Sequence, residues 1–280
     1  MTGAVDTEAP VLSRRVDGGA PSARGLLFTV LGELVHPTGG TAWTTALIDV
    51  FARLGVEEKA TRQAVMRTAA AGWLDAERVG RRTRWHLTAA AGRLLAEGAE
   101  RIYSFDGSRR DWDGQWLVVL ARVPETDRKA RHLLRSRLSW EGLGPLGPGT
   151  WIGVRTDRLR EVQSVLSAAG VDDAHCFLAA HRLGDERAMV AEAWDVPAIA
   201  AAYRSFLADL ADDGAAPGDA VAAQIDLVHR WRRFPLVDPG LPRALLPAAW
   251  PGDPAAVAFR RRHDQWREPS LAGWRTLNNG

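Results

Sequence analysis

Residues 57–87, EEKATRQAVMRTAAAGWLDAERVGRRTRWHL, decide how the first part of the chain folds. Apolar side chains recur at helical spacing up to Gly72, so the sequence predicts a helix over about 57–71. Two runs with strand character follow at 73–79 and 83–87. The short link between them contains Gly80, which is a hairpin signal. The stretch therefore predicts a helix followed by a β-hairpin.

Two further helices are predicted upstream of this stretch. One covers about 23–35, with Ser22 placed as its N-cap, and the segment HPTGG at 36–40 breaks it. The second covers 44–54 and stops at Gly55. Three helices and a hairpin, closed by a helix over about 88–102, predict a winged helix-turn-helix domain spanning 22–104.

The third helix of such a domain enters the DNA major groove with its outward side chains. Arginine suits base reading because its fork can donate two hydrogen bonds to guanine. We expect an inner face of Ala60, Ala64, Val65, Thr68 and Ala69, and we expect Thr61 to point outward. The predicted DNA-binding residues are Lys59, Arg62, Gln63, Met66 and Arg67 on the helix, with Arg81, Arg82 and Arg84 on the hairpin.

Positive charge is concentrated in the same region. Between Lys59 and His86 there are seven basic and two acidic residues, although the net charge of the whole chain is only +2. A local surplus of this size favours a polyanionic partner such as double-stranded DNA. On charge alone, a solvated face with no partner is an equally good interpretation.

The middle of the chain, residues 112–184, predicts a different domain. A polar, glycine-containing stretch at 105–114 separates it from the first. Its predicted order is strand 116–123, helix 127–138, short strand 142–146, strand 150–155, helix 157–169 and strand 174–181. This order is the ferredoxin-like split motif.

The last part, residues 192–274, is predicted to be a helical domain. Helices are expected from about 195, over 220–234 and over 254–266, with a proline-rich connection at 235–254. The fold class is thus α+β, with a winged helix-turn-helix, a central ferredoxin-like domain and a C-terminal helical domain. Residues 1–21 predict a disordered leader with no apolar signal-peptide core, and we expect a cytoplasmic protein.

The composition disfavours several other classes of protein. No apolar run reaches the roughly 18–20 residues needed to span a bilayer, so no membrane partner is expected. The single cysteine, Cys176, excludes an intrachain disulfide and predicts a small buried hydrophobe. No phosphate loop, HExxH motif or GxSxG elbow occurs, and the histidines are scattered. We therefore expect no metal and no catalytic residues, and we expect that the protein is not an enzyme.

Several motifs together resemble the PaaX family, the repressors of phenylacetic acid catabolism. The resemblance extends from about Ala23 to Trp266. Its motifs are TRQAVMR at 61–67, GWL at 72–74, GRR at 80–82, WDGQW at 112–116, WEGLG at 140–144, RWRRF at 230–234, DPGLP at 238–242 and LLPAAWPG at 245–252. The last is long and unusual enough to be specific.

The resemblance implies a homodimer that binds a palindromic operator. It also implies release from DNA when an aryl-CoA thioester, typically phenylacetyl-CoA, binds as effector. Arginine clusters suit the phosphates of CoA, and Arg230, Arg232 and Arg233 are the candidate effector-binding residues. Alternatively, Arg232 or Arg233 simply pairs with Asp238 to brace the C-terminal helices.

Two alternative functions remain open at the level of sequence. One is a PaaX-type regulator of another pathway. The other is a metal-dependent nuclease, because the middle domain also resembles the small ferredoxin-like nucleases of CRISPR systems, which place an Asp at the end of the first strand. Here that stretch is Ala121-Arg122-Val123, with no carboxylate before Glu125. We therefore favour a scaffold for dimerisation or effector sensing.

Overall fold

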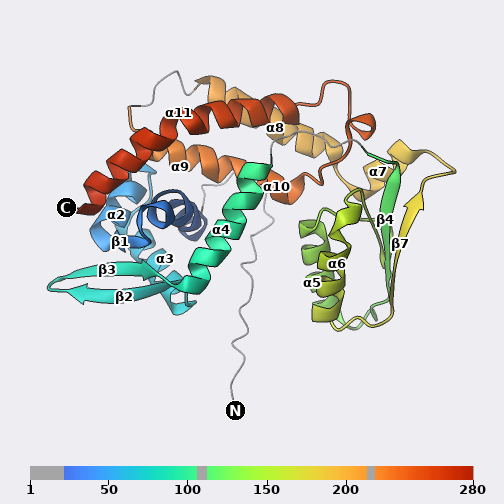
Figure 1. The fold of residues 1–280 in the computed structure, drawn as a ribbon, viewed down its shortest axis with the longest axis horizontal. Helices are drawn as coiled ribbons and strands as arrows, with labels where there is room; N and C mark the ends of the chain where they lie inside the picture. The colour runs from blue at the N-terminus through green and yellow to red at the C-terminus, as the bar shows by residue number, and fades with distance from the viewer. Residues whose placement is uncertain (1–21, 106–111, 213–217, 280) are drawn as a thin grey trace, which may run out of the picture. The chain divides into compact units, whose positions relative to one another are not determined.

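The computed structural model describes residues 22–105, 112–212 and 218–279 (Figure 1). The predicted leader, 1–21, lies outside this part of the chain. The chain forms two compact units, which we describe separately. The first takes its described residues from 22–97, 219–229 and 267–279, and the second from the segments between them. Helices combine with two small antiparallel sheets, so the α+β class is confirmed.

The first unit contains the predicted helices and hairpin. The helices are α1 (Ala23–Val30), α2 (Thr44–Arg53), α3 (Glu58–Ala70) and the start of α4 (Ala89–Ser104). The strands are β1 (Thr41–Trp43), β2 (Leu74–Val79) and β3 (Arg82–Leu87), in the antiparallel order β1-β3-β2. Strand β1 was not predicted, because three residues are too few to show a period of two.

The start of α1 follows the sequence closely, whereas its end differs. The Ser22 hydroxyl accepts a hydrogen bond from the Gly25 amide at 3.1 Å, as expected of an N-cap. A π-helical turn at Leu31–Val35 and a 3-10 turn at His36–Thr38 continue the helix. Gly39 then ends it with a φ of 101°, a conformation that costs glycine nothing.

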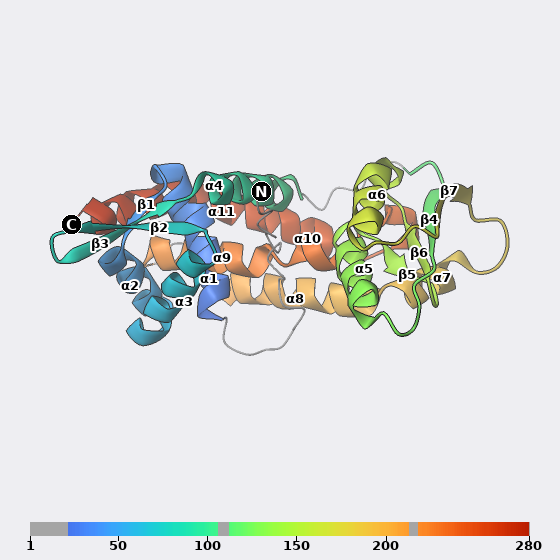
Figure 2. The ribbon, with the colours of Figure 1, turned by 90° about the horizontal axis from the view of Figure 1, so that it is seen from below.

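The core of the first unit includes residues far along the chain. Val221 and Ile225 come from α9 (Ala220–Trp231), and Leu271 and Trp274 come from α11 (Gly252–Asn279). They pack with the apolar faces of α1 and α2 in one cluster. The views in Figures 1 and 2 place the C-terminal end of α11 beside the β1 strand. Segments distant in sequence thus complete one hydrophobic core.

Polar contacts tie the same segments together. The indole Nε1 of Trp274 donates a hydrogen bond to the Thr38 hydroxyl at 2.9 Å. The Thr29 hydroxyl lies 3.0 Å from Nδ1 of His229. Arg53 forms an ion pair of 3.0 Å with Asp219 at the start of α9. Residues 219–229 and 267–279 are therefore integral parts of the first unit.

The prediction that the last helix ends at Trp266 is wrong, because α11 continues to Asn279 with Pro269 inside it. An internal proline costs a helix roughly 3 kcal/mol. Trp274 is fully buried and Leu271 is 4% exposed, and burying such side chains offsets a penalty of that size. The helix survives because its residues beyond Pro269 are buried by the rest of the first unit.

The second unit begins with the end of α4, from Gly98, and continues with a four-stranded sheet and two covering helices. The order along the chain is β4 (Gln115–Ala121), α5 (Arg128–Trp140), β5 (Gly144–Pro145), β6 (Thr150–Gly153), α6 (Leu159–Ala168) and β7 (Ala174–Ala180). The strand order in the sheet is β5-β6-β4-β7. Side chains of α5 and α6 pack on Leu117 and Val119 of β4, so both helices cover the same face (Figure 1).

The remainder of the second unit is helical. It comprises α7 (Glu186–Ala193), which was not predicted, α8 (Val196–Asp212), α10 (Phe234–Val237), a 3-10 turn (Arg243–Leu245) and the first part of α11. The rings of Tyr203 and Phe234 stack with centroids 4.0 Å apart. The Tyr203 hydroxyl also donates to the buried Asp238 carboxylate at 2.8 Å. These contacts fix the proline-rich connection onto α8.

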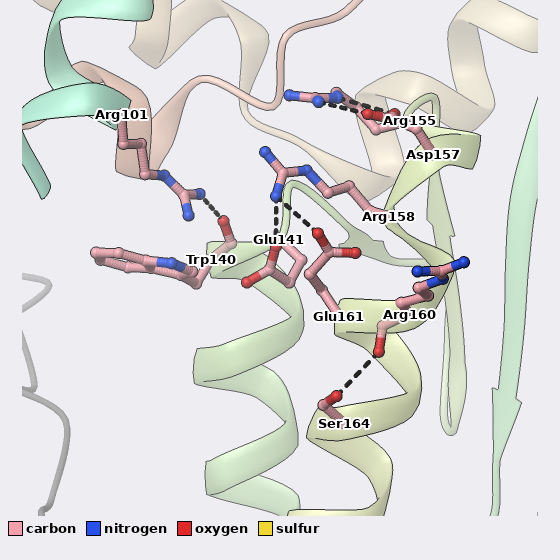
Figure 3. Close-up of polar contacts among 9 residues, drawn as sticks. All are labelled: Arg101, Trp140, Glu141, Arg155, Asp157, Arg158, Arg160, Glu161 and Ser164. Carbon is pink, nitrogen blue, oxygen red and sulfur yellow. Dashed lines mark hydrogen bonds and ion pairs between the residues drawn. The ribbon is translucent and has the colours of Figure 1, made fainter. Parts of the chain in front are cut away.

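A network of charged side chains lies at the end of α5 (Figure 3). Arg101 stacks on the ring of Trp140, with its guanidinium carbon 4.4 Å from the ring centroid, and donates to the Trp140 carbonyl. Nη1 of Arg158 forms ion pairs with Oε2 of Glu141 at 3.8 Å and with Oε1 of Glu161 at 3.2 Å. Burial raises the pKa of Glu141 although Arg101 and Arg158 act in the opposite direction.

We predict that Glu141→Gln leaves the free energy of unfolding at pH 7.5 unchanged or raises it by up to about 1 kcal/mol. A carboxyl whose pKa is raised by folding destabilises the folded state when ionised, and this effect fades as the pH falls through the folded pKa. Arg158 keeps Glu161 as a partner in the variant. Urea unfolding from pH 7.5 to pH 5 measures the difference, which should shrink toward pH 5. A large loss of stability at pH 7.5 would contradict the prediction.

Trp274→Ala should destabilise the protein by about 3–5 kcal/mol, because it empties a large volume inside the first unit. Arg275→Ala is the matched control on the next, exposed residue, and a change within about 0.5 kcal/mol is expected. Chemical denaturation of both variants measures the effect. Equal stability of the two would show that residues beyond Pro269 contribute nothing to the core.

Candidate nucleic-acid interface

Helix α3 divides into a buried face and an exposed, cationic face. Thr61, Ala64, Val65 and Thr68 are buried at helical spacing against the core. The exposed residues are Lys59, Arg62, Gln63, Met66 and Arg67, which are the side chains predicted to point outward. Burial of one face thus turns these residues toward solvent.

The prediction for Thr61 is wrong. Its side chain is 1% exposed, and its hydroxyl donates a hydrogen bond of 3.1 Å to the Glu57 carbonyl. Threonine is small enough to be buried in the first turn of a helix when its hydroxyl bonds to a carbonyl four residues earlier. The inner face is therefore wider than the apolar pattern alone indicates.

The connections at both ends of α3 fix its direction. Gly55 precedes it with a φ of 73° and Gly72 follows with a φ of 75°. Trp73 packs edge-on against Phe28 of α1, with ring centroids 4.7 Å apart. Trp73 and Trp85 are 8% and 6% exposed, so both belong to the core. The helix is thus held by its buried face and by aromatic packing just beyond it.

The cations on α3 differ in their partners. Arg62 forms an i,i+4 ion pair of 2.7 Å with Glu58, and both side chains are more than half exposed. A pair so exposed adds little stability, so another anion can displace Glu58 at small cost. Within the described residues, Lys59 and Arg67 have no hydrogen-bonded or ion-paired partner. Their donors face water and are available to a polyanion.

The β2–β3 hairpin carries the remaining predicted cations. Gly80 turns the hairpin with a φ of 61°, and Arg81 at its tip is exposed. The guanidinium carbons of Arg82 and Arg84 lie 4.1 and 5.2 Å from the ring centroid of Trp43. A cation over an indole face is stabilised by the ring quadrupole. Sequence analysis did not single out Trp43, because it lies in a three-residue strand with no recognisable motif.

One carboxylate lies among these cations. Glu77 faces Arg84 across the hairpin and accepts hydrogen bonds from Nε of Arg84 at 2.8 Å and from Nε2 of His86 at 2.7 Å. These hydrogen bonds lower the pKa of Glu77, and the bond to Glu77 raises the pKa of Arg84. All three side chains are partly exposed, so the pair holds Arg84 in place without removing it from water.

The candidate effector arginines have different surroundings. Arg230 forms an ion pair of 3.3 Å with Asp209. Burial lowers the pKa of Arg232 to about 10, whereas Arg233 is exposed. Asp238 accepts hydrogen bonds from the Tyr203 hydroxyl and the Gly240 amide, both at 2.8 Å. Of the three arginines, only Arg233 is exposed; Arg230 and Arg232 are partly buried.

Other features of the described residues bear on nuclease, metal, thiol and membrane sites. At the end of β4, Arg122 pairs with Asp173 at 3.6 Å, so a cation stands where the CRISPR-type nucleases carry a carboxylate. No group of three His, Cys, Asp or Glu suited to a metal occurs among the described residues. Cys176 is partly buried, and burial raises its pKa, which lowers thiolate reactivity. In the described part of the chain, no helix combines the length and hydropathy needed to cross a bilayer.

The chain matches three models of one protein family. They are the PaaX-like protein over residues 22–91, the PaaX protein central Cas2-like domain over 109–191 and the PaaX-like protein C-terminal domain over 194–276. These ranges, like the domains predicted from sequence, are consecutive along the chain, whereas the two compact units are interleaved.

Two individual proteins are also similar to the chain. The transcriptional repressor PaaX of Escherichia coli (strain K12) is 32% identical over 248 residues, which cover 84% of this chain and 77% of that protein. The structure of the uncharacterized protein Rv0674 from Mycobacterium tuberculosis superimposes with a TM-score of 0.59 at 24% identity, covering 92% and 99% of the two chains. The second similarity concerns the fold alone. Family matches along most of the chain, together with the identity to the E. coli protein, show that it belongs to the PaaX family of transcriptional repressors.

Proposed function

We propose that the protein is a repressor that binds double-stranded DNA through the exposed face of α3 and the β2–β3 hairpin. The observation that carries the proposal is the set of exposed cations on these two elements of one compact unit. In this proposal the first unit works as a winged helix-turn-helix. Its third helix enters the major groove, and the hairpin, as the wing, lies against the phosphate backbone.

The roles of individual residues follow from their chemistry. Arg62, Gln63 and Arg67 carry donors able to read base edges, and Met66 adds an apolar contact for a thymine methyl group. Lys59 and the wing arginines Arg81, Arg82 and Arg84 would contact phosphates, which position the protein without reading sequence. Membership of a repressor family supports the proposal, since the E. coli relative is named a transcriptional repressor.

We further propose a homodimer on a palindromic operator, assembled through the sheet of the second unit. Strand β7 lies at the edge of that sheet, and its Phe177 and Leu178 are 50% and 58% exposed. An edge strand with exposed apolar side chains favours association with another chain. The sheet and its two helices would then form a ferredoxin-like dimerisation and sensing domain.

Release from DNA by an aryl-CoA thioester such as phenylacetyl-CoA completes the proposal. Arg233 supplies an exposed cation for a CoA phosphate, and Arg230 lies three residues earlier, near the end of α9. A thioester from another pathway carries the same CoA phosphates and would bind the same arginines. The acyl group, which is what differs between such thioesters, would then determine which pathway is regulated.

Arg67→Ala should weaken binding to the upstream region of the protein's own gene by about 1–3 kcal/mol, because it removes a base-reading or phosphate-binding donor. Arg93→Ala on α4 is the matched control, since Arg93 is exposed on the first unit but lies outside α3 and the hairpin. Fluorescence anisotropy with labelled duplex measures both variants, and thermal unfolding checks the fold.

Wild-type affinity should also fall with ionic strength, with a log–log slope of roughly −4 to −5 for four to six phosphate contacts. Binding by Arg67→Ala at wild-type strength would remove α3 from the interface. Affinity that does not change with salt would contradict the proposed role of the cations.

Phenylacetyl-CoA should release the labelled duplex and raise the unfolding temperature, since a ligand of the folded state stabilises it by mass action. Free CoA and phenylacetate serve as ligand controls. Arg233→Ala should reduce the temperature shift, whereas Arg204→Ala, an exposed arginine on α8, should leave it unchanged. An equal shift in both variants would remove Arg233 from the effector site.

A further inference from the structure

The strand β1 lies at the edge of the sheet that carries the wing. It pairs with β3 on one side only, with Thr41 opposite His86, Ala42 opposite Trp85 and Trp43 opposite Arg84. The outer side of an edge strand presents unpaired backbone donors and acceptors. With three residues, β1 is at the short end of the usual strand lengths, so pairing with β3 alone gives it little support.

A single side chain supplies that support. The carboxamide oxygen of Asn278 accepts a hydrogen bond from the Trp43 amide at 2.8 Å, and its Nδ2 donates to the Thr41 carbonyl at 2.9 Å. A carboxamide offers the same donor and acceptor as a peptide group. Asn278 therefore takes the place that a neighbouring strand would have along the outer side of β1.

Asn278 is itself held in place by the helix that carries it. Trp274 lies four residues earlier and is therefore on the same face of α11. It is fully buried in the core of the first unit, and its indole Nε1 donates to the Thr38 hydroxyl just before β1. Leu277 also packs against this core. The carboxamide thus meets β1 from a rigid helix and not from a loop.

The residue that Asn278 holds carries two wing cations. The Trp43 ring lies under the guanidinium groups of Arg82 and Arg84, at 4.1 and 5.2 Å. The attraction between a guanidinium and an indole face restrains where the cation lies, and the planar guanidinium carries five N–H donors that suit phosphate oxygens. Fixing such side chains before binding lowers the entropy lost when DNA is bound.

We propose that Asn278 and Trp43 are positioning residues for DNA binding, in which the end of α11 orients the wing arginines Arg82 and Arg84 through β1. The inference rests on the proposed function, because it concerns the same DNA-binding surface. It adds that the surface depends on Asn278, which is more than 190 positions from the wing arginines in sequence and whose carboxamide bonds to β1.

The test compares Asn278→Ala with Asn279→Ala in the full-length protein. Asn279 is the adjacent, exposed residue and makes none of these hydrogen bonds. We expect Asn278→Ala to weaken binding to the labelled duplex about two- to tenfold, and Asn279→Ala to bind like wild type. Unfolding temperatures of both variants establish that the fold is retained.

A double-mutant cycle separates positioning from a general structural effect. In the Arg82→Ala/Arg84→Ala background, Asn278→Ala should cause no further loss, because the groups that it orients are absent. The same fold loss in both backgrounds would overturn the proposal. Trp43→Phe and Trp43→Leu provide a second route if Asn278→Ala unfolds. Phenylalanine keeps an aromatic face and should retain most of the affinity, whereas leucine should weaken binding about two- to tenfold, because the arginines remain but are no longer positioned.

The outcomes distinguish this inference from the proposed function. If wild-type protein shows no salt-dependent binding to the duplex, the proposed function itself fails. If wild type binds and Arg67→Ala weakens binding, but Asn278→Ala binds as tightly as Asn279→Ala, only the positioning role fails. If Trp43→Leu retains wild-type affinity, the link from β1 to the wing arginines is wrong.

Discussion

Burial of one face of α3 is the constraint on which the proposed DNA-binding surface depends. The face formed by Thr61, Ala64, Val65 and Thr68 packs into the core, and each of these residues is at most 5% exposed. Once that face is buried, only the opposite face of the helix is left for solvent, so the charged and polar residues of α3 are exposed together on it. Hydrophobic packing, which carries no information about DNA, therefore sets the direction of the cations.

The second feature of the surface is the uneven pairing of its charges. Arg62 and Arg84 each have a carboxylate partner, whereas Lys59, Arg67 and Arg81 have none among the described residues. Exposed ion pairs contribute little to folding, so the carboxylates orient their arginines at small energetic cost. The unpaired cations retain their full charge for an incoming polyanion. The surface thus combines pre-oriented and free cations on two neighbouring elements.

Much of this arrangement follows from local sequence. The apolar periods of the helices, Gly55 and Gly72 around α3, and Gly80 in the hairpin predict the elements and most of the outward residues. Three features needed tertiary information. Thr61 is polar, and only its bond to a backbone carbonyl permits burial. Strand β1 is too short to show a period. The residues after Pro269 form a helix because Leu271 and Trp274 are buried against segments more than 200 residues earlier, and no local pattern encodes that contact.

The interleaving of the first unit also bears on how the protein is made. Its core contains side chains from α1 near residue 26 and from α11 near residue 274. Domains formed from one continuous segment can fold while the ribosome is still synthesising the rest of the chain. Here residues 22–97 leave the ribosome well before Leu271 and Trp274, which complete their core, have been translated. A nascent polypeptide arrested before α11 therefore lacks Trp274, and the three helices and hairpin at its start cannot reach their final packing until synthesis has passed residue 279.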